Sequence, residues 1–269
     1  YDACVYDDSA GTYIAGLNLD ENIGNVDLAN DKLASVSGIY PMVGLERDEF
    51  RALAANRGAG WRQQDFWLTS AVQMLYLVEY GDFNSQANLG DGNVNGSYTG
   101  SSADQNDSPH TVAGASNGFG NASTDGSQPS AGAKPGTAYM SYRGIENFYG
   151  NCWDFVDGFN IIDLVPYVNN DDTTFADDTT TNYEQIGDAM PSGNGFVTDI
   201  QNIGGAFIPD SVGGSSSTFL TDDFFQNTGN RVAIFGGNAG RGAVAGAFLW
   251  NVGSDSSDDS RAFGGRLSF

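Results

Sequence analysis

The segment Arg231 to Phe269 reads RVAIFGGNAGRGAVAGAFLWNVGSDSSDDSRAFGGRLSF. It opens with an apolar run and closes with FGGRLSF, and mostly Gly, Ala, Ser, Asn and Asp lie between. A long tract of such residues is typically a flexible linker. Here Phe248, Leu249, Trp250 and Val252 interrupt the tract. The pattern therefore predicts a surface segment that is anchored to a core at both ends and in its middle.

The composition limits the class of protein. The chain has 269 residues, of which 40% are hydrophobic, and this is enough for the core of one large domain. Lys and Arg number 11 against 34 Asp and Glu, which gives a net charge of −23. Nucleic-acid binding depends on Lys and Arg that neutralise phosphates, so DNA, RNA and anionic membranes are not expected partners. No apolar run approaches the roughly 20 residues of a membrane helix, so no membrane insertion is expected.

Few residues suit metal or redox chemistry. Cys4 and Cys152 could form a disulfide or remain free thiols, and the sequence leaves both open. His110 has no second His or Cys beside it in a polar stretch, which predicts a solvated side chain. Aspartate pairs at 171–172 and 177–178 could bind Ca²⁺, but they lack EF-hand spacing and favour a solvated acidic loop. We expect no cofactor, with Ca²⁺ as the one metal to consider.

Two stretches have the signals of helices. Residues 46–57 begin with acidic side chains and precede Gly58, which predicts a helix of about three turns. Residues 62–80 precede Gly81 and form a second helix. Its apolar positions, which we expect in the core, are Trp67, Ala71, Met74, Leu75 and Val78. Helices within an otherwise strand-and-turn sequence predict an α+β fold with the helices packed against a sheet.

The middle of the chain divides into a polar and an aromatic part. Residues 84–137 are too poor in apolar side chains to build a core of their own, which predicts an insertion of long loops. Residues 141–162 crowd aromatic side chains between glycines, which predicts a tight turn and a buried strand. Glu146, Asp154 and Asp157 lie within this stretch. Since no nucleophile accompanies them, a structural role is favoured over acid–base catalysis.

Several motifs resemble one family. GNCWDF at 150–155 resembles the GN-x-W-E-W signature of the C-type lectin fold of the formylglycine-generating-enzyme type. FGGNA at 235–239 and FGGRLSF at 263–269 look like the RGGSW and closing GFR segments of that family. The stretch 40–86, with YRGIENFYGN at 142–151, is similar to variable proteins of diversity-generating retroelements, most of all those of archaeal viruses. The resemblance implies one ligand-binding domain over 1–269, with helices on short twisted antiparallel sheets and long loop insertions.

The resemblance also implies that a retroelement diversifies residues 231–269 to change binding specificity. The implied variable positions are Ala239, Gly240, Arg241, Val244, Leu249, Gly253, Ser254, Asp258, Ser260 and Ala262. The implied scaffold positions are Phe235, Gly236, Gly237, Phe248, Trp250, Gly264, Gly265 and Arg266. We expect Arg241, Leu249, Trp250 and Asp258 at the centre of the ligand contact, because aromatic and Arg side chains dominate most interfaces. For Trp250, a ligand contact and a buried scaffold position both stay open.

The implied function is receptor binding by a tail or surface component of a virus or phage, on the virion surface or outside the cell. The expected partner is a protein or surface receptor on a host cell, and a homo-oligomer is one expected form because it adds avidity. No catalysis is expected, because the oxidase of this fold family needs paired cysteines near the C-terminus and none follows Cys152. The alternative is a lectin-like protein of fixed specificity, or a structural virion surface protein, without diversification.

Overall fold

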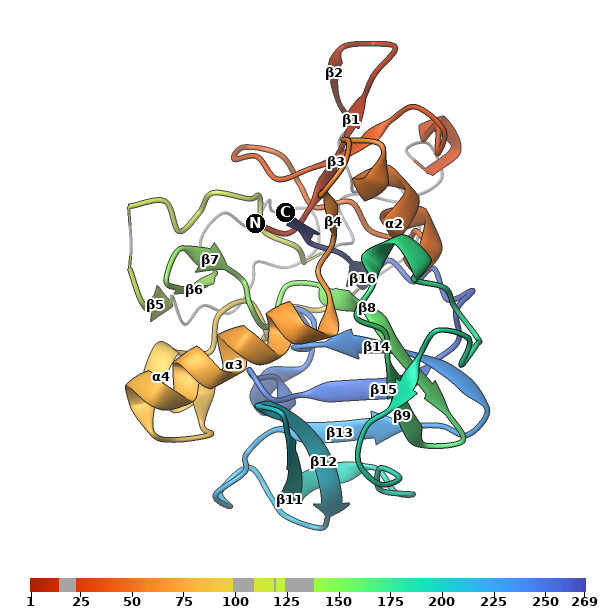
Figure 1. The fold of residues 1–269 in the computed structure, drawn as a ribbon. Coiled ribbons are helices and arrows are strands. Elements are labelled where there is room, and N and C mark those ends of the chain that lie inside the picture. The colour runs from red at the N-terminus through yellow and green to blue at the C-terminus, as the bar shows by residue number, and fades with distance from the viewer. Residues whose placement is uncertain (15–22, 99–108, 119, 124–137) are drawn as a thin grey trace.

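A curled sheet of nine strands forms the centre of the molecule (Figure 1). The computed structural model describes residues 1–14, 23–98, 109–118, 120–123 and 138–269. The strands lie in the order β10-β9-β8-β14-β15-β13-β11-β12, and β16 pairs with β8. The pairs β13–β15 and β8–β16 are parallel and the other pairs are antiparallel. The strands are β8 (Trp153–Ile162), β9 (Val165–Val168), β10 (Glu184–Gln185), β11 (Gly195–Ile203), β12 (Ala206–Val212), β13 (Asp223–Gln226), β14 (Asn230–Phe235), β15 (Trp250–Ser254) and β16 (Phe263–Gly264).

Shorter strands and a few helices surround this sheet. The small sheets contain β1 (Cys4–Asp7), β2 (Thr12–Ile14) and β3 (Lys32–Ala34), then β4 (Arg62–Gln63) with β17 (Leu267–Ser268), then β5 (Ala122–Ser123), β6 (Met140–Tyr142) and β7 (Ile145–Glu146). The helices are α2 (Arg47–Ala55), α3 (Phe66–Tyr80) and α4 (Ser85–Leu89), with 3-10 turns η1 (Ile23–Asn25), η3 (Asp172–Thr174) and η4 (Gly242–Val244). The protein is therefore a mixed α+β structure with few helices. Parts of the polar stretch 84–137, which is predicted to form long loops, lie outside the described residues.

Both predicted helices are present. In α2 the carboxylate of Glu46 and that of Glu49 form a capping box, and Phe50 and Leu53 are buried. The second helix begins at Phe66 rather than at residue 62, because Asp65 accepts the Leu68 N–H at 2.8 Å as an N-cap. Gly81 ends α3 in the left-handed conformation (φ 64°). None of the helices in the described ranges is long and apolar enough to span a membrane.

The predicted core face of α3 is wrong. Phe66, Val72 and Tyr76 are buried, whereas Ala71, Leu75 and Val78 are exposed, and Trp67 and Met74 are half-buried. The reason is that α3 carries apolar side chains on every side, so a helical period in the sequence fits several faces equally well.

The core consists of two clusters on opposite faces of the central strands. Along β8, Phe155 belongs to one cluster and Val156 to the other, as the alternation of side chains in a strand requires. Helix α3 covers the first cluster, where the Phe66 and Phe159 rings lie 4.4 Å apart. Helix α2 covers the second, where Phe50 meets Phe155. The predicted buried strand in 141–162 is thus confirmed as β8, which is buried on both faces.

Candidate ligand-binding surface

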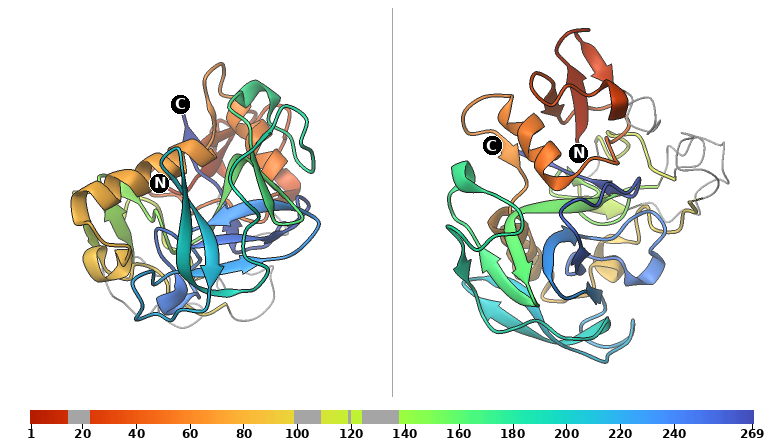
Figure 2. Two further views of the ribbon diagram at one scale, coloured as in Figure 1. Left: turned by 60° about the horizontal axis from the view of Figure 1, so that its bottom comes forward. Right: turned by 90° about the vertical axis from the view of Figure 1, so that its right-hand side faces the viewer.

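The C-terminal segment leaves and rejoins the central sheet several times. After β14 the chain forms a loop that contains η4, returns as β15, and then runs through a second loop into β16 and β17. The right-hand view of Figure 2 brings these loops, in dark blue, toward the viewer. The implied scaffold residues Phe235, Gly236, Gly237, Phe248, Trp250, Gly264, Gly265 and Arg266 are all buried. The segment is therefore attached to the core at its start, middle and end, as its apolar residues predict.

Arg266 attaches the end of the segment. Its guanidinium is 4% exposed and forms ion pairs with Asp154 and Asp2. It also donates to the carbonyl oxygens of Glu146 (2.8 Å) and Asn147. Burial raises the pKa of Asp154 to about 7, although Arg266 opposes this rise. The structural role predicted for Asp154 is confirmed, because its partner is a buried arginine.

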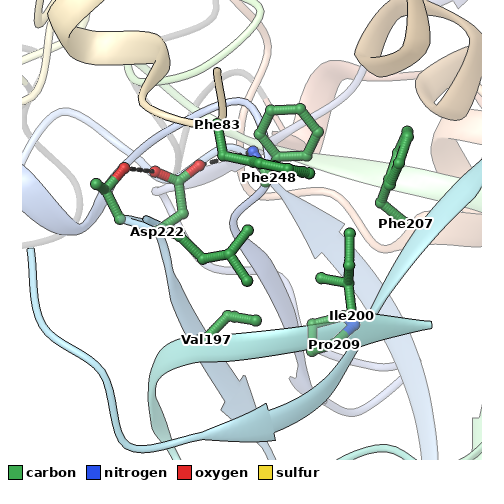
Figure 3. A pocket seen from close by; sticks show the side chains of 9 residues that line it. Phe83, Val197, Ile200, Phe207, Pro209, Asp222 and Phe248 are labelled. Atoms are coloured by element: carbon green, nitrogen blue, oxygen red, sulfur yellow. Dashed lines mark hydrogen bonds between the residues drawn. The ribbon is translucent and has the colours of Figure 1, made fainter. Parts of the chain in front are cut away.

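Asp222 attaches the middle of the segment (Figure 3). Its carboxylate accepts the backbone N–H of Phe248 at 2.7 Å and lies 3.3 Å from the Thr221 hydroxyl, which donates to it. Burial raises the pKa of Asp222 to about 7. Gly246 lies so close that an added Cβ would be 2.2 Å from the carboxylate oxygens. No sequence pattern marked Asp222, because its partner lies 26 residues away.

The pocket beside Asp222 is too small for a ligand. Apolar side chains that include Phe83, Val197 and Phe207 line it (Figure 3). Its cavity volume is about 10 Å³. A single water needs roughly 10–15 Å³, so this space can hold one water at most. The side chains that line it pack against the Phe248 ring.

The eleven predicted ligand-binding residues divide by burial. Gly240 is exposed and Arg241, Val244, Gly253, Asp258 and Ser260 are half-exposed, whereas Ala239, Leu249, Trp250, Ser254 and Ala262 are buried. The Trp250 ring packs against Phe159 and Phe235, and its Nε1 donates to the carbonyl oxygen of Phe207. Leu249 and Trp250 are thus wrong as ligand contacts, and Trp250 takes its alternative role as a buried scaffold residue. In β15 the side chains alternate, so Trp250 and Ser254 point inward while Gly253 lies on the outer side.

The half-exposed Arg241 side chain lies against two aromatic rings. Its guanidinium carbon lies 4.9 Å from the ring centroid of Phe225 and 5.3 Å from that of Trp153. Such cation–π contacts position a guanidinium without using its N–H donors. The Arg241 side chain makes no hydrogen bond or ion pair with any residue that the structure describes. Its five N–H donors thus meet no acceptor within hydrogen-bonding distance in the described ranges, although its charge opposes the burial that raises the pKa of Asp223.

Tyr98 and His110, which lie outside the segment, pack beside Arg241 and Arg261. The Arg261 guanidinium lies 5.3 Å from the Tyr98 ring, and the Tyr98 hydroxyl is 3.2 Å from His110 Nε2. A Cβ on Gly240 would lie 3.5 Å from the Tyr98 ring, which places Tyr98 against the Arg241 loop. Burial, helped by Arg261, lowers the pKa of His110 to about 3. The predicted solvated His110 is wrong: the side chain is fully buried and neutral, and it supports Tyr98.

The other residues considered for chemistry have structural partners. Cys4 and Cys152 are free and buried, and Cys4 Sγ donates to the carbonyl oxygen of Ala34. Asp177 forms ion pairs with Arg47 and Arg51, so this part of the predicted acidic loop is not simply solvated. Within the described ranges no group of three or more His, Cys, Asp or Glu side chains is arranged to hold a metal.

A wider cleft lies at the C-terminal end of α2. Its volume is about 330 Å³, and Trp61 and Phe175 contribute aromatic walls. Arg51 and Asp157 also line it, paired with each other at 2.7 Å. Ligand pockets begin at about 300 Å³, so this cleft is large enough for a small molecule. No sequence pattern marked this cleft, because its walls come from distant parts of the chain.

In comparisons with known proteins, no family model and no curated protein matches this chain.

Proposed function

We propose that this protein is a receptor-binding component of a virus or phage, and that a retroelement diversifies its C-terminal segment. The proposed fold is the C-type lectin fold of the formylglycine-generating-enzyme type, with which the curled sheet and few helices are compatible. The motifs that resemble this family carry the proposal. Two of their residues, Trp153 and Arg266, are buried parts of the scaffold.

The single observation that best supports the proposal is the contrast within the C-terminal segment. Its anchors are buried, whereas Gly240, Arg241, Val244, Asp258 and Ser260 reach the surface. Side chains at such positions can change without the several kcal/mol that core substitutions typically cost, about 2–5 kcal/mol for large-to-small changes. A backbone of this kind tolerates replacement of its contact residues while the fold is kept.

Arg241 supplies the chemistry of the contact. Rings of Trp153 and Phe225 hold the guanidinium in place, so little conformational entropy is lost when it binds. A planar guanidinium recognises carboxylates through two parallel hydrogen bonds. The proposed ligand is therefore a host-cell protein or surface receptor that presents an acidic group, bound outside the cell or on the virion surface.

The first experiment is to sequence the DNA downstream of the codon for Phe269. We expect a near-copy of the segment and a reverse-transcriptase gene, with differences at template adenines. The differences should fall at surface positions such as Arg241, Val244 and Asp258. Absence of a copy, or differences that are as frequent at Phe248 and 264–266, would contradict diversification.

A protein of fixed specificity is the second candidate, and the 330 Å³ cleft favours it. The cleft residues Trp61, Arg51 and Asp157 lie outside 231–269, so diversification would not alter a ligand bound there. A screen of soluble glycans and small acids against the protein, Trp61→Ala and Arg241→Ala separates the two. If Trp61→Ala abolishes binding and Arg241→Ala does not, fixed specificity is supported. If Arg241→Ala abolishes binding and Trp61→Ala does not, the first proposal is supported.

A further inference from the structure

The cleft at the C-terminal end of α2 is built from remote parts of the chain. Residues within 55–62, which lead from α2 to β4, line one part of it, and residues within 172–175, which follow β9, line another. Figure 1 shows the turn after β9, in green, beside α2. Arg51 of α2 and Asp157 of β8 complete the lining. No lining residue belongs to 231–269, so the chemistry of this cleft is separate from that of the C-terminal surface.

The two aromatic walls of the cleft are held in place by their neighbours. The Trp61 ring centroid lies 4.8 Å from the Arg57 guanidinium carbon and 5.1 Å from the Phe269 ring centroid. Phe175 packs over Gly158 so closely that an added Cβ there would lie 2.6 Å from its ring. Both walls are nevertheless half-exposed. Rings that are fixed before a ligand arrives lose little conformational entropy when it binds.

Two ion pairs supply the polar groups of the cleft. Arg51 donates to the Asp157 carboxylate through Nε at 2.7 Å and through Nη2 at 2.8 Å. Its Nη1 makes no hydrogen bond with any residue that the structure describes. Arg62 Nη1 lies 3.9 Å from a carboxylate oxygen of Asp172, which is too far for a hydrogen bond. The cleft therefore holds N–H donors and a carboxylate acceptor whose hydrogen-bonding capacity is only partly used.

The charges that line the cleft balance, and this limits the class of ligand. Among the described residues, two arginines and two aspartates are its only charged lining: Arg51, Arg62, Asp157 and Asp172. An anion would face both carboxylates, and a cation would face both guanidinium groups. A hydroxyl group donates and accepts, so it can bind to either member of such a pair. Balanced pairs between aromatic walls thus favour a neutral ligand that has several hydroxyl groups and an apolar face.

We propose that this cleft binds a neutral sugar residue. A sugar ring has a face of C–H groups that packs on an aromatic wall such as Trp61, and its hydroxyl groups bind Arg51 Nη1 and the Arg62–Asp172 pair. Apolar walls with a few polar groups that fix the orientation are the usual construction of a small-molecule site. The cleft volume of about 330 Å³ lies within the range of such sites.

This inference rests on the second candidate function, a protein of fixed specificity, and it names the class of ligand. It does not depend on diversification, because Arg241 and the cleft share no residue. A retroelement copy without sugar binding would leave the first proposal standing. Sugar binding without such a copy would leave this inference standing.

The test is the binding of methyl glycosides of glucose, galactose, mannose and N-acetylglucosamine to the purified chain, followed by saturation-transfer NMR and tryptophan fluorescence. We expect saturable binding of at least one glycoside. Trp61→Ala and Asp172→Ala should each weaken it by about tenfold or more, since each removes a contact with the sugar. Trp61→Phe keeps an aromatic wall and should lose less than Trp61→Ala.

Two control variants lie outside the cleft. Tyr13→Ala removes a 37% exposed aromatic ring, and Asp210→Ala removes an exposed carboxylate on β12. Both should bind the glycoside as the unchanged chain does. Circular dichroism should show an unchanged fold for every variant, because each replaces an exposed or half-exposed side chain.

Methyl glucuronide tests the charge balance, because it adds a carboxylate to methyl glucoside and should bind more weakly. If it binds more tightly and Trp61→Ala abolishes its binding, the neutral class is overturned while the cleft remains a site of fixed specificity. The proposal as a whole is overturned if none of the four glycosides binds at about 100 mM. It is also overturned if Trp61→Ala and Asp172→Ala bind as the unchanged chain does.

Discussion

Arg266 and Arg241 belong to the same C-terminal segment, but the protein surrounds them in opposite ways. Arg266 is buried and its donors meet Asp2, Asp154 and two carbonyl oxygens. Arg241 lies at the surface against two aromatic rings, and no described carboxylate pairs with it. The Arg266 guanidinium therefore uses its hydrogen bonds within the fold, whereas the Arg241 guanidinium has the donors that the proposed ligand contact requires. The contrast separates residues that must stay constant from residues that can change.

The largest expected effect is at Arg266. Replacing it in Arg266→Met leaves Asp2 and Asp154 as unpaired buried carboxylates, and removing one partner of a buried pair typically costs about 3–5 kcal/mol. Urea denaturation should show this loss in the free energy of unfolding. Arg266→Lys keeps the charge and should lose less. A change below about 1 kcal/mol in Arg266→Met would remove the basis for calling this region an anchor.

The next largest effect is at Gly246. The Cβ in Gly246→Ala would collide with the Asp222 carboxylate, and forced overpacking in a core costs about 1–3 kcal/mol. Thermal unfolding should show a lower midpoint. Gly240→Ala is the matched control, because its Cβ meets Tyr98 at an ordinary 3.5 Å and stability should change by less than about 0.5 kcal/mol. Equal effects of both substitutions would refute the contact with Asp222.

The pH dependence of the unfolding free energy also tests how Asp222 anchors the C-terminal segment. Because the folded protein raises the pKa of Asp222 to about 7, it holds a proton that the unfolded chain releases near pH 4. The contribution of Asp222 is thus most favourable at low pH and is lost as pH rises from about 4 to about 7. In Asp222→Asn the unfolding free energy should therefore fall less between pH 4 and pH 7 than in the unchanged protein. We expect a difference of about 1–2 kcal/mol between the two proteins. Parallel pH profiles would show that Asp222 is not buried as described.

Arg241 should have the smallest effect on stability and a large effect on binding. Loss of its exposed cation–π contacts in Arg241→Ala should cost about 0.5–1 kcal/mol of folding stability. The binding of Arg241→Ala to a receptor-bearing cell or to purified receptor should weaken by about 2 kcal/mol or more, as for other arginine anchors. Arg143→Ala removes a 54% exposed arginine elsewhere and should leave binding unchanged. Unaltered binding by Arg241→Ala would move the contact away from this surface.

Local signals in the sequence determined much of the scaffold. Acidic first-turn residues and glycines after the last turn located α2 and the end of α3, because caps act on neighbouring backbone groups. The aromatic run around Trp153 located the buried strand β8. The apolar residues of the C-terminal segment correctly indicated that it is anchored at both ends and in the middle.

The face of each element that is buried depends on tertiary packing. The sequence could not choose among the apolar faces of α3, nor show that Trp250 points inward, because both depend on what packs against them. His110 is buried beside Tyr98, whose ring also contacts Arg261 from the far end of the chain. Asp154 holds Arg266, 112 residues away, while Arg241 is left to the rings of Trp153 and Phe225. Spacing along the chain fixes local conformation, but the partner of a buried or exposed charge is set by contacts between remote segments.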